Sequence, residues 1–148
     1  EQTGRILATL GDILHNPATP LPGVRETLAK LKESGGLTMI LLTKGDLLDQ
    51  LKKVERSGLG EYFDRVKVTA WKGEKEFLGL CRETGVSPSE MVSVGNSFKS
   101  DIAPMLSIGG WGIHVPSKVL WEHERMEEFG HPRLRKVEQF AEILDYLG

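Results

Sequence analysis

The stretch Met91-Val92-Ser93-Val94-Gly95-Asn96-Ser97-Phe98-Lys99-Ser100-Asp101-Ile102 decides the fold of this chain. Its first residues form a short apolar run that predicts a buried strand, and Gly95 opens a polar loop that leads into a helix. Open α/β sheets bind ligands in loops of this kind, at the carboxyl ends of strands. Asn96 and Asp101 supply amide and carboxylate oxygens, the hard donors that Mg²⁺ prefers. An ordinary strand-to-helix turn with a capping aspartate has the same pattern, so the rest of the chain must separate the two interpretations.

The composition is that of a globular protein with no bias toward a charged partner. The chain has 148 residues, enough for one domain with a buried core, and its net charge is -2. It contains no run of 18 apolar residues and does not begin with a signal peptide. The single cysteine, Cys81, excludes an internal disulfide and suits a reducing compartment. We therefore expect a cytoplasmic protein that binds neither nucleic acid nor a membrane.

Strand and helix patterns alternate along most of the chain. The nearly continuous apolar run at 37–43 predicts a strand buried on both faces, which is typical of parallel sheets. Further strands are predicted at 66–69, 91–95, 111–115 and, as an edge strand, 135–138. Helical spacing predicts the helices between and after them, at 22–34, 47–57, 74–84, 102–108, 121–129 and 139–147. This order predicts an α/β fold, a three-layer Rossmann-like parallel sheet with helices on both faces.

The first 15 residues carry a different pattern. Ile6, Leu7, Leu10, Ile13 and Leu14 are spaced as on one side of a helix, which predicts a helix over residues 5–15. The residue before proline avoids the helical region, so this helix is expected to end at 16–17.

Chemically useful side chains follow three successive strands. Thr43 ends the first strand, Lys72 follows the second, and Asn96 and Asp101 follow the third. Because parallel strands end at the same edge of a sheet, a hydroxyl, an ammonium group and metal-type oxygens are expected to converge there. That set is suited to holding a phosphoryl group. Each residue also has a structural interpretation: Thr43 or Asp101 as a helix cap, Lys72 as a solvated lysine. Their joint occurrence at three strand ends favours the site.

These motifs resemble those of the haloacid dehalogenase-like hydrolase superfamily. Leu41-Leu42-Thr43-Lys44-Gly45-Asp46 is similar to its second motif, an apolar strand ending in Thr or Ser. Lys72 corresponds to the third-motif lysine, and 94–102 resembles the acidic metal-binding motif. The resemblance implies a reaction through a covalent aspartyl intermediate on a small phosphorylated metabolite. It implies phosphoryl binding and catalysis by Thr43 and Lys72, further substrate contacts from Lys44 and Gly45, and Mg²⁺ binding by Asn96 and Asp101. Most members have Asp where this chain has Asn96, so its metal site would carry one negative charge fewer.

The nucleophile motif of that superfamily, Asp-x-Asp after an apolar strand, is absent from the sequence. Asp12 falls in the predicted helix, while Asp46 and Asp49 follow the wrong strand. Residues 1–16 resemble the last helix of a cap domain, and 17–148 the α/β core. This layout implies that roughly 80 preceding residues are missing. We therefore expect a vacant place at the centre of the sheet, between the strands ending at Thr43 and Val94, to be completed by a missing segment or another chain.

The leading hypothesis is a Mg²⁺-dependent phosphatase of this superfamily, with its aspartate nucleophile outside the chain, so that the 148 residues alone are inactive. The alternative is a non-catalytic fragment or a regulatory or binding module with the same fold. A dehalogenase is a weaker third hypothesis, because that reaction does not need the metal-type oxygens. Two other residues are noted: Trp71 either borders the entrance to the site or packs in the core, and His114, on a predicted strand, is interpreted as structural.

Overall fold

The computed structural model describes residues 6–10, 23–34, 36–115 and 128–147. In that part of the chain the strands are β1 (Ile6–Leu10), β2 (Leu37–Lys44), β3 (Arg65–Thr69), β4 (Met91–Gly95), β5 (Trp111–His114) and β6 (Leu134–Lys136). The α-helices are α1 (Val24–Ser34), α2 (Leu47–Ser57), α3 (Glu74–Thr84), α4 (Ala103–Ser107) and α5 (Leu144–Leu147). Short helical turns are η1 (Gly60–Tyr62), η2 (Pro88–Glu90), the π-helical η3 (Phe98–Ile102) and η5 (Phe140–Ile143).

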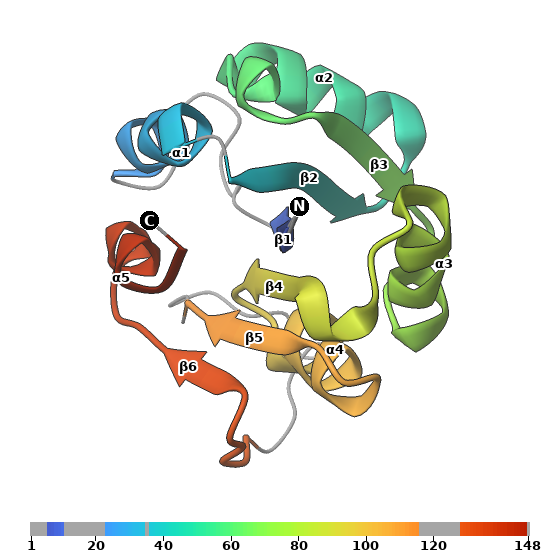
Figure 1. The fold of residues 1–148 in the computed structure, drawn as a ribbon. Helices are drawn as coiled ribbons and strands as arrows, with labels where there is room; N and C mark the ends of the chain where they lie inside the picture. Colours follow the sequence, from blue (N-terminus) through green and yellow to red (C-terminus); the bar gives the residue numbers. More distant parts are fainter. Residues whose placement is uncertain (1–5, 11–22, 35, 116–127, 148) are drawn as a thin grey trace.

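The strands form a six-stranded sheet in the order β3-β2-β1-β4-β5-β6, and every neighbouring pair is parallel (Figure 1). The predicted Rossmann-like parallel sheet is therefore confirmed. The chain order reverses between β1 and β4, the switch point beside which doubly wound sheets bind their ligands. Because the sheet is parallel, the carboxyl ends of β2, β3 and β4 all lie at one edge, as the sequence predicted.

The centre of the sheet differs from the prediction. The prediction of a helix over residues 5–15 is wrong for Ile6–Leu10, because these residues form the strand β1. Residues 11–15 lie outside the described part of the chain. The place between β2 and β4 that was expected to be vacant is occupied by β1, with Leu10 paired to Leu41 on one side and to Val94 on the other. The facing edges of β2 and β4 offer backbone hydrogen bonds to a strand placed between them. These bonds stabilise residues 6–10 as a strand, although their apolar residues have the spacing of a helix. The proposed boundary at residue 16 stays a prediction.

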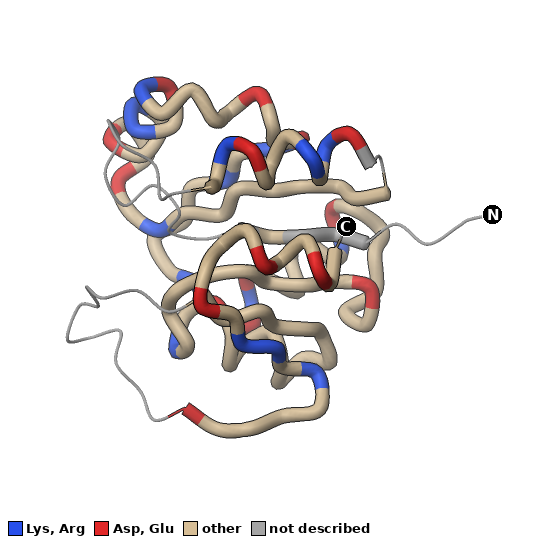
Figure 2. Tube along the Cα trace, turned by 90° about the vertical axis from the view of Figure 1, so that its left-hand side faces the viewer, with Lys and Arg blue, Asp and Glu red and all other residues tan. Residues whose placement is uncertain are grey.

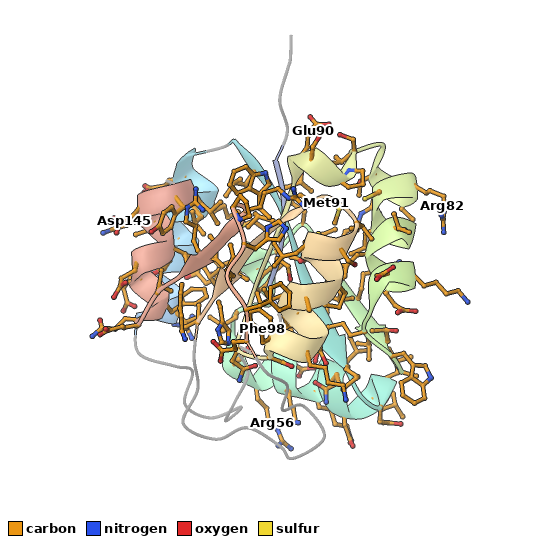
Figure 3. All side chains as sticks on the ribbon, turned by 90° about the horizontal axis from the view of Figure 1, so that it is seen from below. Arg56, Arg82, Glu90, Met91, Phe98 and Asp145 are labelled. Atoms are coloured by element: carbon orange, nitrogen blue, oxygen red, sulfur yellow. The ribbon has the colours of Figure 1, made fainter. Side chains whose placement is uncertain are left out.

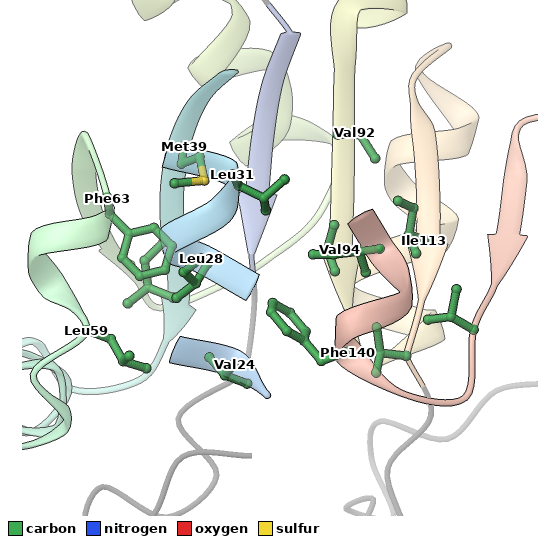
Figure 4. Close-up of a cluster of buried hydrophobic side chains, with 14 of the residues drawn as sticks. Val24, Leu28, Leu31, Met39, Leu59, Phe63, Val92, Val94, Ile113 and Phe140 are labelled. Carbon is green, nitrogen blue, oxygen red and sulfur yellow. The ribbon is translucent and has the colours of Figure 1, made fainter. Parts of the chain in front are cut away.

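Side chains of β2 alternate between two hydrophobic clusters. Met39 and Leu41 join the cluster beneath α1, α2 and η5, which Figure 4 shows in close-up. Ile40 and Leu42 join the cluster beneath α3 and α4. All four are almost fully buried, so β2 is covered on both faces, as its continuous apolar sequence predicted. The sheet is thus the middle of three layers.

Local signals fix several of the element ends. A capping box formed by Ser87 and Glu90 opens η2 before β4. The edge strand is found as β6, but the closing helix is split into the 3-10 turn η5 and the short α5. The helix predicted over 121–129 lies outside the described residues for all but its last two positions, and Glu128 and Phe129 are not helical.

Charged residues of both signs are interspersed on the helices and outer loops, while the central strands are largely uncharged (Figure 2). In the described part of the chain, no helix combines the length and apolar character needed to cross a membrane.

Candidate functional site

The predicted site residues lie where the sheet edge places them. Thr43 is the next-to-last residue of β2 and is almost fully buried. Lys72 comes three residues after the end of β3, and Asn96 immediately follows β4. Figure 3 shows Phe98, in the loop after Asn96, at the opposite end of β4 from Met91. The cluster therefore occupies the carboxyl edge, with β2 and β4 on either side of β1.

Lys72 and Asp101 form a buried ion pair. Lys72 Nζ lies 2.7 Å from Asp101 Oδ1, and each side chain is only 1% exposed. This excludes a solvated lysine. Charges taken out of water are costly unless they are closely paired, so the pair fixes both side chains in one arrangement. The geometry joins two motifs that are 29 residues apart in the sequence.

The loop from Gly95 to Asp101 is closed by its own hydrogen bonds. The second carboxylate oxygen of Asp101 accepts a hydrogen bond of 3.2 Å from the Ser97 N–H. Ser97, rather than Asp101, caps the following turn, because its Oγ accepts from the Ser100 N–H at 3.1 Å. That turn, η3, is π-helical, a rare geometry that recurs at functional sites. The capping interpretation of Asp101 is thus wrong.

Asn96 presents a side-chain oxygen with no protein partner. Its Oδ1 is buried and makes no hydrogen bond to the described residues. A buried amide oxygen left unpaired is unfavourable, so it calls for a ligand. The amide and carboxylate oxygens of Asn96 and Asp101 fit a hard cation such as Mg²⁺. Among the described residues, no group of three or more His, Cys, Asp and Glu side chains gathers in the way a zinc site requires.

Thr43 contacts a residue that the sequence did not single out. Its Oγ1 donates a 2.7 Å hydrogen bond to Oε1 of Gln50 in the first turns of α2. The Gln50 side chain also lies across Gly45, where a Cβ atom would stand 2.7 Å from Nε2. Asp46 caps α2 by accepting from the Asp49 N–H, so Thr43 is not the helix cap. The hydroxyl of Thr43 is therefore held by a side chain rather than by the helix backbone.

The remaining candidates take different places. Lys44 is half-buried, and Gly45 is exposed with its N–H bonded to the Thr69 carbonyl at 3.0 Å. Trp71 is 77% exposed, so core packing is excluded, and it lies on the surface directly before Lys72. His114, interpreted from sequence as structural, reaches the site: its Nε2 lies 3.2 Å from the Asn96 carbonyl oxygen.

The sequence carried little signal for Gln50, since a glutamine in a helix is common. The sequence carried a clearer signal for His114, because this residue ends the strand that follows the metal-type loop. The register pairs His114 directly with Gly95, the residue before Asn96. A search of the neighbouring strand end, at the same level of the sheet, would have found it.

Comparison with known proteins agrees with the motifs. The family model for haloacid dehalogenase-like hydrolases matches residues 7–109. Glyceraldehyde 3-phosphate phosphatase of Pyrococcus furiosus is 32% identical over 94 residues, which are 60% of this chain and 39% of that protein. Human N-acylneuraminate-9-phosphatase is 32% identical over 91 residues, 58% of this chain and 36% of its own. The chain thus spans well under half the length of these curated relatives.

Solved structures show the same fold. A haloacid dehalogenase-like family hydrolase from Xanthomonas campestris superposes with a TM-score of 0.75 at 32% identity, over 90% of this chain and 57% of that one. An uncharacterized protein from Listeria monocytogenes has a TM-score of 0.79 at 20% identity and matches 96% of both chains, which shows the fold alone. With the family model covering well over half of its residues, this chain belongs to the haloacid dehalogenase-like hydrolases.

Proposed function

We propose that the complete protein is a Mg²⁺-dependent phosphatase that acts on a small phosphorylated metabolite through an aspartyl-phosphate intermediate. The observation that carries this proposal is the buried Lys72–Asp101 ion pair beside the unpartnered Asn96 oxygen. A fixed ammonium and a set of oxygen donors at one sheet edge are suited to a phosphate ester and its cation. The two curated relatives are both phosphatases, which supports the proposal.

Each residue has a defined role in this proposal. Thr43 binds the oxygens of the phosphoryl group through its hydroxyl, Lys44 and Gly45 border the same site, and Lys72 neutralises the phosphoryl charge and orients the nucleophile. Asn96 and Asp101 hold Mg²⁺ through their oxygens. When bound, the ion would offset negative charge on the phosphate oxygens. Since Asn96 is neutral where most family members have Asp, we expect weaker Mg²⁺ binding than with two carboxylates.

The nucleophile is proposed to lie outside the described residues. In the described cluster, Asp101 is engaged with Lys72 and the Ser97 N–H, and it does not serve as the attacking group. Two sources remain. One is a segment preceding Glu1 in a longer protein, and the other is Asp12, which follows the end of β1 by two residues in the sequence. The attacking carboxylate displaces the alcohol from phosphorus, and water then releases inorganic phosphate from the acyl phosphate.

Phosphate release from p-nitrophenyl phosphate tests the proposal. We expect the complete protein to release phosphate with Mg²⁺ and to lose this activity in EDTA. The Lys72→Met variant should be inactive, whereas the control variant Lys52→Met, on the exposed side of α2, should keep its activity. The 148-residue chain and its Asp12→Asn variant are assayed beside it. Turnover by the chain that is lost on Asp12→Asn assigns Asp12; turnover by the complete protein alone assigns a preceding segment. Absence of turnover over a broad panel of phosphate esters would contradict the phosphatase.

A non-catalytic binding module is the second candidate. It is favoured by one observation, that the described cluster contains no aspartate free of the Lys72 pair. Binding of inorganic phosphate without turnover by the complete protein would support it over the phosphatase. We also propose a cytoplasmic location, on the basis of the single cysteine, Cys81, which is buried and forms no disulfide.

A further inference from the structure

His114 lies beside the loop that carries Asn96. It ends β5, is 4% exposed, and pairs in register with Gly95, the last residue of β4. Two consecutive carbonyl groups, those of Gly95 and Asn96, are held by the last residue of β5 and the residue after it. The Val115 N–H donates to the Gly95 carbonyl at 2.9 Å, and the His114 side chain contacts the Asn96 carbonyl through Nε2 at 3.2 Å. The first of these bonds continues the sheet, whereas the second is a side-chain contact beyond its end.

The partner of Nε2 determines which nitrogen carries the proton. A carbonyl oxygen only accepts hydrogen bonds, so Nε2 is the protonated nitrogen and donates. The ring is further oriented by Phe98 of η3, which packs against it edge to face, with 5.5 Å between the ring centroids and 77° between the planes. Phe98 belongs to the same loop as Asn96. His114 is thus held by the loop at two points, one polar and one aromatic.

The other ring nitrogen faces the segment before β6. Nδ1 is buried without a hydrogen-bond partner among the described residues, and the nearest carboxylate oxygen, Glu128 Oε1, lies 3.6 Å away. Glu128 in turn accepts a 2.9 Å hydrogen bond from Lys136 of β6. The contact of Nε2 with Asn96 is therefore the one hydrogen bond of the ring in the described structure, and it is directed at the metal-type loop.

We propose that His114 is a positioning residue, which fixes the main chain at Asn96 so that Asn96 Oδ1 is presented to the metal ion. This rests on the proposed role of Asn96 in Mg²⁺ binding. Asn96 begins a loop whose far end is fixed by the buried Asp101 carboxylate. His114 fixes the near end, so both ends of the loop are immobilised before an ion binds. Groups that orient a ligand in this way commonly change metal affinity on the order of 10–100-fold when they are removed.

Mg²⁺ binding to the complete protein, measured by titration calorimetry with the metal alone, tests the proposal. We compare His114→Gln, which retains a donor at the distance of Nε2, with His114→Asn, which is too short, and His114→Phe, which has none. We expect about 10–100-fold weaker binding in the Asn and Phe variants and nearly wild-type binding in the Gln variant. His131→Phe, a half-buried histidine in the turn before β6, is the matched control.

The outcomes separate the two proposals. Equal Mg²⁺ affinity in the Gln and Asn variants would overturn the positioning role while leaving the metal site intact, and this pair decides even where the Phe variant does not fold. A wild-type protein that binds no Mg²⁺ would overturn both the metal site and the role of His114. As a second readout, the amide resonances of residues 96–98 are expected to move in the Asn variant and to return in the Gln variant.

Discussion

Gly95 and Asp101 are packed so closely that a Cβ atom on residue 95 would overlap the Asp101 carboxylate. Even the Asp101 Cβ would lie 2.7 Å from it, closer than real Cβ atoms approach. The glycine is therefore required by space rather than by backbone conformation. It lets the carboxylate turn back under the end of β4, where Lys72 and the Ser97 N–H bind it.

Replacement of this glycine tests the packing. We expect Gly95→Ala to destabilise the protein by about 1–3 kcal/mol, because the buried carboxylate has no room to move. Urea denaturation gives the change in unfolding free energy. Gly79→Ala, in the middle of α3 with nothing within 4 Å of the added methyl, is the control and should stabilise by up to about 1 kcal/mol. Equal effects of the two substitutions would contradict the packing argument.

The Lys72–Asp101 pair predicts strong coupling. Removing one member leaves a buried charge, so Lys72→Met and Asp101→Asn should each cost about 3–5 kcal/mol of stability. The double variant should be closer to wild type than the sum of the two, since neither charge is then left unpaired. Denaturant unfolding of the wild type, the two single variants and the double variant gives the four stabilities of a double-mutant cycle. Additive effects within about 0.5 kcal/mol would show that the two groups do not depend on each other.

The sequence predicted the places of Thr43, Lys72 and Asn96 in the fold better than it predicted the centre of the sheet. Each of these residues lies at the carboxyl end of a strand or shortly after it, and in a parallel sheet all such positions lie at one edge. Residues 6–10 were misassigned because Ile6, Leu7 and Leu10 satisfy helical spacing, while the demand of β2 and β4 for a partner strand is not a local property of the sequence. Gln50 and His114 were missed as site residues for a related reason: their contacts are made across elements.

The Thr43–Gln50 contact predicts sensitivity to the identity of residue 50. The Thr43 hydroxyl has one hydrogen, now donated to Gln50 Oε1, and it must be released to bind a phosphoryl oxygen. If the Gln50 amide rotates, its Nε2–H group can donate a hydrogen bond to Thr43 Oγ1, in place of the bond that Oε1 now accepts from the Thr43 hydroxyl. An ionised glutamate cannot donate, so Gln50→Glu should lower kcat/KM by about tenfold or more, a cost of roughly 1.4 kcal/mol, and more than Gln50→Ala does. Steady-state assays with p-nitrophenyl phosphate decide, and a fully active Gln50→Glu variant would contradict the role.

Cys81 is expected to be chemically inert in the folded protein. Burial raises the pKa of its thiol, against smaller lowering effects of its backbone hydrogen bond and of Arg82. The reactive thiolate is therefore scarce near neutral pH, and Cys81, which lies on α3, is only 8% exposed in the hydrophobic cluster between this helix and the sheet. Labelling with a disulfide reagent should be slow in buffer and rapid in denaturant. Rapid labelling of the native protein would show that α3 opens readily.

Glu128 offers a test of the contact between β6 and the segment before it. The hydrogen bond from Lys136 lowers the pKa of the Glu128 carboxyl, opposed by burial and aided by the charge of Lys136. Because the folded pKa lies below the ordinary value of 4.5, the stabilisation is present above that pH and is lost as the pH falls through the folded pKa. The Glu128–Lys136 pair is about half exposed, so its contribution to stability is small, about 0.2–1 kcal/mol.

An NMR titration of the Glu128 carboxyl carbon, which measures the pKa directly, is therefore a better test than a stability measurement. Lys136→Met should raise the pKa of Glu128 and leave that of Glu83 unchanged, whereas Lys67→Met should do the reverse, because Lys67 is the hydrogen-bond partner that lowers the pKa of Glu83. A Glu128 titration that does not respond to Lys136→Met would contradict this contact.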